Sequence, residues 1–182
     1  MALVVVLGGA RSGKSSLAQR LASAFDGSVT FIATAEARDE EMADRIANHR
    51  ALRPSGWITI EEPIDVVGAL EAAPPHACVV LDCLTLWVAN LLEAGWTADA
   101  IEEEGRRAAA LAADRVAPTL VVSNEVGMGV VPSTGLGRSF RDLQGRVNAT
   151  FCALADRSAL VVAGRVLELA SADGLLKEFA RG

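Results

Sequence analysis

The chain has 182 residues, of which 51% are hydrophobic and 22% are charged. This is the composition of a globular protein, and the length allows one domain over residues 1–182 with one substantial core. The formal net charge of −6 argues against a nucleic-acid partner, because binding a phosphate backbone requires clustered Lys and Arg side chains.

Six short apolar runs predict β-strands. The first, Leu3 to Leu7, is apolar throughout, which is typical of a strand covered on both faces of a sheet. The others are Val29 to Ala33, a weaker run at Ile58 to Ile60, Cys78 to Leu81, Thr119 to Ser123 and Ala159 to Ala163.

Helical patterns separate these runs. After Lys14, the spacing of Leu17, Leu21, Ala24 and Phe25 predicts a helix with one buried stripe. Further helices are expected around Met42 and Ile46, over Leu84 to Glu93, from the N-cap Thr97 to about Arg115, and from about Ser139 to a point before Ala159. Alternating strands and helices predict an α/β fold with a mostly parallel central sheet and helices on both of its faces.

The turn after the first strand carries the clearest chemical signal. The segment Gly8-Gly9-Ala10-Arg11-Ser12-Gly13-Lys14-Ser15, called the cradle below, matches the phosphate-binding pattern Gly-x-x-x-x-Gly-Lys-Ser between a strand and a helix. Its glycines let backbone N–H groups surround phosphate oxygens, and the helix N-terminus adds a partial positive charge. Lys14 is expected to reach the β- and γ-phosphates, and the Ser15 hydroxyl to bind Mg²⁺. The alternative is a glycine turn with a chance lysine, which requires motif and context to agree by accident.

Acidic and polar residues follow two other strands. Val79-Val80-Leu81-Asp82 is an apolar strand that ends in a carboxylate, and in P-loop enzymes such an acid stands beside the metal. Asp82 is therefore the second expected Mg²⁺ residue, although many such acids only cap the next helix. Residues 34–36 follow the second strand and should emerge at the same carboxyl edge, where open α/β sheets bind ligands.

Only two histidines occur, and their settings differ. His76 follows Pro74-Pro75 and is expected to be a solvated loop residue. His49 extends the apolar stripe of Met42 and Ile46, with Arg residues around it. A neutral imidazole near a phosphate is a nucleophile, yet a lone histidine on an apolar stripe is more often a core residue, so spacing alone leaves both readings open.

The three cysteines and the lengths of the apolar stretches indicate the cellular compartment of the protein. Cys78, Cys83 and Cys152 lack the spacing of metal ligands and form an odd set, which favours free thiols in a reducing compartment. No apolar stretch approaches the roughly 20 residues of a membrane helix, and Ala2 to Leu7 has no basic flank of a signal peptide. We therefore expect a cytoplasmic protein without membrane insertion.

One long segment lacks periodicity. Asn124 to Gly137 contains four glycines and one proline, and a loop of that length in a small domain is usually functional.

Beyond the cradle, further motifs occur in a fixed order along the chain. They are Ile32-Ala33-Thr34, Asp39-Glu40-Glu41-Met42, Arg45-Ile46-Ala47-Asn48-His49-Arg50, Asp82-Cys83-Leu84-Thr85 and Asn124-Glu125-Val126-Gly127-Met128-Gly129. This ordered set, and above all the last motif, resembles the bifunctional adenosylcobinamide kinase and adenosylcobinamide-phosphate guanylyltransferase family of cobalamin assembly.

The resemblance implies a RecA-like P-loop NTPase fold, usually trimeric, with two activities. Members phosphorylate the hydroxyl of adenosylcobinamide's aminopropanol arm with ATP or GTP. They then transfer GMP from GTP onto that phosphate through a guanylylated histidine, which corresponds here to His49. Mg²⁺ and Lys14 would neutralise the leaving pyrophosphate. Guanine and ribose contacts are then expected from Thr34, Ala35, Glu36, Arg50, Ala51, Leu52, Arg53 and Glu61, beside the cradle and Asp82.

Three positions depart from the family pattern. Ala149 follows Asn148 where glutamine is usual, and Arg165-Val166 stands where a small residue and proline are common. Asp82 is glutamate in some members, which preserves the carboxylate. Two other functions also fit the cradle: a monofunctional P-loop kinase for another small alcohol, which would not need His49, and a nucleotide-dependent switch or assembly ATPase whose long loop moves on hydrolysis.

Overall fold

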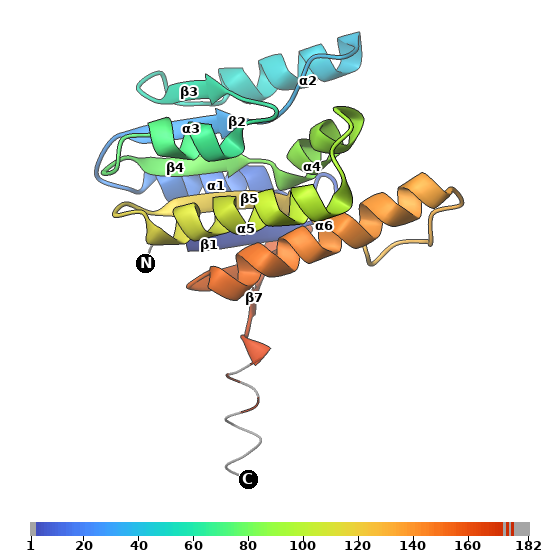
Figure 1. The fold of residues 1–182 in the computed structure, drawn as a ribbon. Coiled ribbons are helices and arrows are strands. Elements are labelled where there is room, and N and C mark those ends of the chain that lie inside the picture. The colour runs from blue at the N-terminus through green and yellow to red at the C-terminus, as the bar shows by residue number, and fades with distance from the viewer. Residues whose placement is uncertain (1–2, 173, 175, 177–182) are drawn as a thin grey trace.

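The computed structural model describes residues 3–172, 174 and 176; the predicted domain over residues 1–182 extends beyond this part. Seven described strands form one sheet. They are β1 (Leu3–Gly8), β2 (Val29–Ala33), β3 (Ile58–Glu61), β4 (Cys78–Asp82), β5 (Thr119–Asn124), β6 (Arg157–Val162) and β7 (Arg165–Leu169). Their order is β3-β2-β4-β5-β1-β6-β7, and every neighbouring pair is parallel except β6 and β7 (Figure 1). The predicted mostly parallel α/β fold is confirmed.

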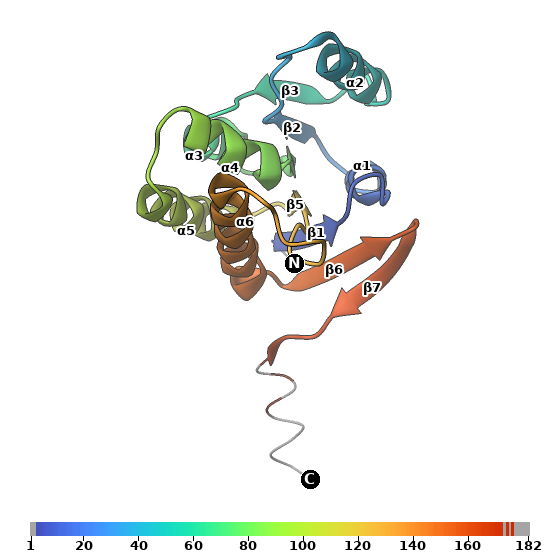
Figure 2. The same ribbon diagram turned by 90° about the vertical axis from the view of Figure 1, so that its right-hand side faces the viewer.

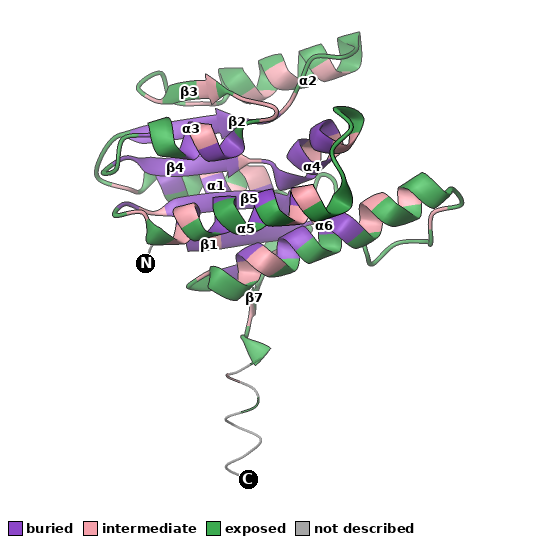
Figure 3. Cartoon of the chain, viewed as in Figure 1, coloured by how far each residue is buried: buried purple, intermediate pink, exposed green. Residues whose placement is uncertain are grey.

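The helices are distributed unevenly over the two faces. They are α1 (Lys14–Ser23), α2 (Glu40–Ala51), α3 (Val66–Ala72), α4 (Leu84–Glu93), α5 (Ala98–Asp114) and α6 (Gly135–Leu154). One core cluster joins α3, α4, α5 and α6 to one face of the sheet, and a second, smaller cluster joins α1 to the other face (Figure 2). The strands therefore bury side chains on both faces, whereas α2 has no buried residue and lies with β3 at the exposed end (Figure 3).

The predicted buried stripe of α1 is wrong. Ala18 and Ala22 are fully buried, while Leu21 is 44% exposed. Small alanine side chains let the helix backbone approach the strands closely. The larger residues Leu17, Leu21 and Phe25 instead border an apolar groove beside β6 and β7.

Two elements escaped the sequence patterns. Helix α3 is only seven residues long, too short to show a stripe, and is capped by Asp65, whose Oδ1 accepts from the Gly68 N–H at 2.8 Å. Strand β7 pairs antiparallel with β6 across a two-residue turn in which Ala163 (φ 50°) and Gly164 (φ 75°) are both left-handed, as tight hairpins require. Helix α6 begins at Gly135, earlier than expected, because Thr134 caps it and accepts from the Gly137 N–H at 3.1 Å.

Candidate functional site

A cavity of about 690 Å³ opens at the carboxyl edge of β1, β2, β4 and β5, beneath α2. It falls within the size range of small-molecule sites. Its wall brings together residues from distant parts of the sequence, among them Lys14, Ser15, His49, Asp82 and Asn124. This is the edge at which parallel α/β sheets bind their ligands.

The cradle has the backbone geometry that its glycines predict. A Cβ on Gly8 would lie 2.5 Å from Ser12 Oγ and 2.6 Å from the carbonyl oxygen of Val161, so no side chain fits there. Gly13 has a φ of 97°, which glycine adopts without strain. The Gly164 N–H donates to the Ser12 carbonyl at 2.9 Å, so the β6–β7 turn braces the loop from outside.

Lys14 and Asp82 carry opposite charges into the buried base of the cavity. The Lys14 Nζ donates to the Gly9 carbonyl at 3.1 Å, which places the ammonium group at the beginning of the cradle. Burial lowers the pKa of Lys14, and Asp82 and Cys83 oppose this effect. Burial likewise raises the pKa of Asp82, against the opposing influence of a hydrogen bond from Ser15 and of nearby cationic groups including Lys14.

The base of the cavity fits a magnesium ion. Asp82 Oδ2 is buried without a hydrogen-bond partner, and Ser15 lies beside the same carboxylate. The described residues contain no group of three or more His, Cys, Asp or Glu side chains that could enclose a metal. Mg²⁺ commonly binds with one or two carboxylates and takes its other ligands from water and phosphate oxygens, which is the donor set that Asp82 and Ser15 offer.

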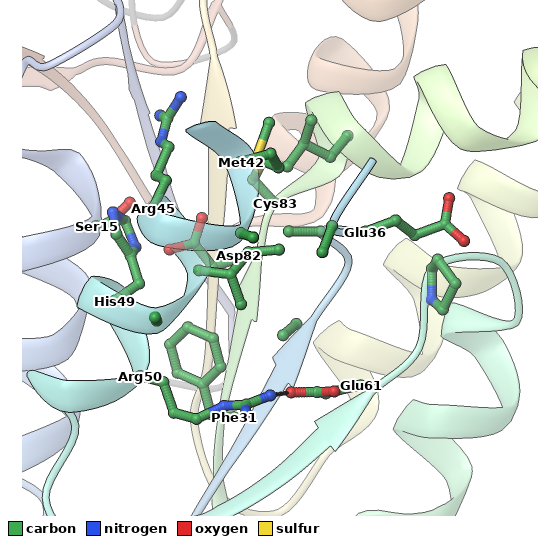
Figure 4. Close-up of a pocket in the computed structure, with 18 of the residues that line it drawn as sticks. Ser15, Phe31, Glu36, Met42, Arg45, His49, Arg50, Glu61, Asp82 and Cys83 are labelled. Carbon is green, nitrogen blue, oxygen red and sulfur yellow. Dashed lines mark ion pairs between the residues drawn. The ribbon is translucent and has the colours of Figure 1, made fainter. Parts of the chain in front are cut away.

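Helix α2 holds His49 over the cavity. Asp39 caps the helix and accepts from the Met42 N–H at 2.7 Å. Met42, Ile46 and His49 are the half-buried positions of α2, and the rest of the helix is exposed. Figure 4 shows the imidazole facing Asp82, and Ser15 lines the same cavity. The predicted stripe is therefore confirmed, and all three of its members line a cavity instead of a core.

The far end of the cavity combines charge and aromatic surface. Arg50 forms an ion pair with Glu61 (Figure 4). The Arg53 guanidinium lies 3.7 Å from the centre of the Phe31 ring, whose other neighbour, Trp57, is stacked at 6.4 Å. A flat cation on an aromatic ring provides a surface on which a planar group can bind.

The structure brings most, but not all, of the expected nucleotide contacts to the cavity wall. Ala35, Glu36, Arg50, Arg53 and Glu61 line it. Of the cradle, Lys14 and Ser15 line it, and residues 8–13 do not. Of the residues expected outside the cradle, three do not line it: Thr34, Ala51 and Leu52.

These three residues are occupied or turned away. The Thr34 hydroxyl is buried, donates to the Cys83 carbonyl at 2.7 Å and accepts from the Cys83 N–H at 2.8 Å. Ala51 and Leu52 are exposed at the end of α2, and Leu52 retains 72% of its accessible surface. Thr34 therefore fastens the loop after β2 to the loop after β4 rather than offering its side chain to a ligand.

Asn90 was not singled out from the sequence as a site residue. Its Nδ2 donates to the carbonyls of Thr34 at 2.8 Å and Pro63 at 3.1 Å, and its Oδ1 accepts from Arg38 at 2.8 Å. It thus holds two cavity loops from inside α4. The available signal was an asparagine within a mostly apolar helix, since a buried amide needs partners.

Other sequence expectations concern the cysteines, His76 and the departures from the family pattern. Cys78, Cys83 and Cys152 are free cysteines, the first two buried and the third half-buried. His76 is exposed, as expected of a loop residue. The departures Ala149 and Val166 are both exposed, so neither alters the cavity wall. No helix in the described part of the chain is long and apolar enough to cross a membrane.

Comparison with known proteins shows the family of this chain. Residues 4–169 match the family model described as cobinamide kinase / cobinamide phosphate guanyltransferase. The chain belongs to this family. The bifunctional adenosylcobalamin biosynthesis protein CobP of Pseudomonas aeruginosa is 43% identical over 91% of this chain and 95% of its own length. Those named CobU are 40% identical in Salmonella typhimurium and 41% in Escherichia coli, over 89% of this chain and 96% of each relative.

Two solved structures share the fold of this family member. A type III secretion system ATPase superposes with a TM-score of 0.56 at 9% identity, covering 96% of this chain, which spans 60% of that protein. A KaiC-like protein from Pyrococcus horikoshii gives a TM-score of 0.50 at 12% identity, over 87% of this chain and 70% of that one. The expected RecA-like P-loop NTPase fold is confirmed.

Proposed function

We propose that this chain phosphorylates adenosylcobinamide with ATP or GTP and then transfers GMP from GTP to the new phosphate by way of His49. The observation that carries the proposal is the position of His49. A separate helix places its imidazole on the wall of the cavity that also contains Lys14, Ser15 and Asp82. A kinase of another small alcohol would need the cradle but not this histidine.

In the kinase step, the substrate hydroxyl oxygen forms a bond to the γ-phosphorus. The bond from that phosphorus to the β–γ bridging oxygen breaks, the nucleoside diphosphate leaves, and the hydroxyl proton passes to solvent. Catalysis of such a transfer is mainly positioning and charge stabilisation. Lys14 supplies the positive charge, and the backbone N–H groups of the cradle hold the phosphates.

In the guanylyl step, an imidazole nitrogen of His49 attacks the α-phosphorus of GTP. An N–P bond forms as the bond to the β-phosphate oxygen breaks, and pyrophosphate leaves. An oxygen of the cobinamide phosphate then attacks the same phosphorus, the N–P bond breaks, and His49 is restored. Covalent catalysis of this kind divides one difficult displacement into two easier ones.

Magnesium is part of the proposal. The Ser15 hydroxyl and the unpartnered Asp82 Oδ2 would hold the ion. When bound, it supplies charge neutralisation on the phosphate oxygens. The Asp82 carboxylate also interacts electrostatically with three cationic side chains, those of His49, Lys14 and Arg53.

The guanine and ribose of the nucleotide are assigned to the end of the cavity away from the cradle. Glu61 and Glu36 offer carboxylates there, and Arg53 on Phe31 offers a flat cationic surface. The corrin ring is far larger than a nucleotide, so only its phosphorylated arm would enter the cavity. The ring itself would remain outside.

We further propose that the protein works as a cytoplasmic homotrimer. The resemblance suggests this state, and the apolar groove along α1 offers a surface that another copy could cover. Light scattering after gel filtration should give three times the chain mass of 19.0 kDa. A monomeric mass at assay concentrations would contradict the trimer.

The decisive experiment tests for the covalent intermediate. The protein is incubated with α-labelled GTP and Mg²⁺ without acceptor, then denatured, and retained label is tested for the acid lability and base stability of a phosphoramidate. We expect label on the wild type and none on His49→Ala. His76→Ala is the matched control, since that histidine is exposed in a loop, and it should label normally. Absence of label on the wild type, or label on His49→Ala, would rule out the proposed route.

A further inference from the structure

Among the described residues, three arginines line the cavity, and they differ in what they contact. Arg50 forms an ion pair with Glu61. The Arg53 guanidinium lies on the Phe31 ring. Arg45 forms no ion pair and no hydrogen bond with any residue in the described part of the chain. It is therefore the arginine of the cavity wall whose charge remains available to a ligand.

Arg45 lies one turn of α2 before His49. Side chains four residues apart lie on one side of a helix, and both of these line the cavity. Glu41 stands four residues before Arg45, at the spacing of helical ion pairs, yet within the described chain the two do not pair. Figure 4 shows the Arg45 side chain extending away from the ion pair of Arg50 and Glu61. The free guanidinium and the imidazole thus belong to one wall.

Arg45 and Lys14 are two cations at one cavity. The Lys14 ammonium is buried at the base, where it donates to the Gly9 carbonyl at 3.1 Å, and Arg45 is exposed on the helix above. Burial lowers the pKa of Lys14, and the charge of Arg45 lowers it further. Two like charges that repel one another are stabilised by an anion bound between them. The pair therefore favours an anion on the cradle side of the cavity.

The chemistry of the guanylyl step determines which anion binds there. In phosphoryl transfer the entering and leaving atoms lie roughly in line with the phosphorus. The imidazole of His49 therefore enters opposite the oxygen of the departing pyrophosphate. In the second displacement the acceptor oxygen enters opposite the N–P bond, which is the place that pyrophosphate has left. One anion site thus receives the leaving group of the first displacement and the acceptor phosphate of the second.

Lys14 and Arg45 provide what such an anion requires. Lys14 reaches the β- and γ-phosphates in this motif, so its ammonium contacts the pyrophosphate and then the acceptor phosphate. A phosphate monoester carries a charge of about −1.5 to −2 at pH 7, which is more than one ammonium group neutralises. A guanidinium adds a second charge and can bind phosphate through two parallel N–H···O bonds.

We propose that Arg45 and Lys14 form a phosphate clamp that binds the departing pyrophosphate and then, in the same place, the phosphate group of the acceptor. The inference rests on the proposed function and deepens it, because it assigns the acceptor phosphate to the cradle side of the cavity. An oxygen of the clamped phosphate forms a bond to the α-phosphorus as the bond from that phosphorus to His49 breaks. Pyrophosphate leaves before the acceptor binds, so the two anions occupy the clamp in strict succession.

The test starts from the guanylylated protein. Wild type and variants are loaded with α-labelled GTP, pyrophosphate is removed by gel filtration, and release of label is followed in a single turnover. One series adds cobinamide phosphate as the acceptor, and the other adds pyrophosphate, which re-forms GTP. For Arg45→Ala we expect the half-saturating concentration of both probes to rise about tenfold or more, as for a lost hydrogen bond between charged groups. Arg45→Lys keeps the charge but not the two parallel donors, so its values should lie between those of wild type and Arg45→Ala.

Three controls separate the clamp from general effects of charge, folding and corrinoid binding. Arg20→Ala removes an equal charge from an exposed position of α1 outside the cavity, and it should behave as wild type in both series. The urea midpoint of Arg45→Ala should match that of wild type, because the side chain makes no bond to any described residue. The KM for cobinamide in the kinase step, whose acceptor carries no phosphate, should stay within about threefold of the wild-type value.

The outcomes are distinct. A shift below about threefold for both probes in Arg45→Ala would refute the role of Arg45, and a shift confined to one probe would refute the shared place. A KM for cobinamide that rises as far as the half-saturating concentration of cobinamide phosphate would overturn the clamp, because Arg45 would then contact another part of the acceptor. Complete failure of Arg45→Ala to accept label, with Arg20→Ala labelled, would likewise overturn it. Absence of label on the wild type would refute the proposed function instead, and this is seen before any probe is added.

Discussion

A methyl group at Gly8 tests whether close backbone contact shapes the cradle. In Gly8→Ala the new Cβ meets Ser12 Oγ at 2.5 Å and the Val161 carbonyl oxygen at 2.6 Å. The serine can rotate, but Val161 belongs to β6 and is the register partner of Gly8, so β1 or β6 must move. Overpacking of this kind costs about 1–3 kcal/mol. The smaller entropy of the unfolded alanine variant offsets about 0.4–1 kcal/mol of this cost, which leaves a net loss of up to about 2.6 kcal/mol relative to wild type.

The matched control is Gly9→Ala, because a Cβ there meets nothing within 4 Å. The unfolded-state entropy change is the same in both alanine variants, so they differ by the overpacking cost of about 1–3 kcal/mol. In a chain of this size, 1 kcal/mol corresponds to about 2–4 °C in Tm, so Gly8→Ala should melt about 2–12 °C below Gly9→Ala in scanning calorimetry. The displaced strand also moves the N–H groups that hold phosphate. We therefore expect calorimetric titration with GTP to show at least about tenfold weaker binding for Gly8→Ala than for wild type. Equal Tm values for the two variants, with unchanged GTP affinity for Gly8→Ala, would refute the reasoning.

Three further outcomes are expected. Burial raises the pKa of Asp82 above 3.8, so the folded state binds its proton more tightly and stability falls as the pH rises through the folded pKa. Asp82→Asn should therefore have a higher urea midpoint than wild type at neutral pH, with the gap closing below pH 3.8 and activity lost; a lower midpoint would contradict this. Arg115 donates to the carbonyls of Leu70, Ala73, Pro74 and Ala77 at 2.7–3.2 Å. Arg115→Lys, which keeps the charge but not the fork, should lose about 2–3 kcal/mol in urea unfolding with kcat unchanged, and a loss below about 0.5 kcal/mol would count against it. Burial raises the pKa of the Cys78 and Cys83 thiols to about 11, so iodoacetamide at about pH 8 should alkylate neither until urea unfolds the chain; fast labelling of the native protein, measured by mass spectrometry, would show otherwise.

Local sequence determined the elements with strong periodic or apolar patterns. The run Val29–Ala33 and the helix Leu84–Glu93 begin and end where their patterns predict. The cradle was recognisable because its glycines, lysine and serine lie together in one short segment, residues 8–15. Prediction from the sequence was less accurate for short or amphipathic segments. A seven-residue helix shows no stripe, and small alanines packed against the sheet where larger residues of α1 were expected.

Tertiary structure alone decided which residues share the site. The distance along the chain from Lys14 to His49, Asp82 and Asn124 says nothing about their separation in space. Four parallel strands end at one edge and bring three of these residues to it, while α2 suspends the fourth above them. The sequence stripe of α2 identified the side of the helix that His49 occupies, but a half-buried stripe is the same whether it covers a core or a cavity. The roles of Thr34 and Asn90 also depend on partners far away in the chain, because the hydrogen bonds of a buried polar group are made by whatever the fold places beside it.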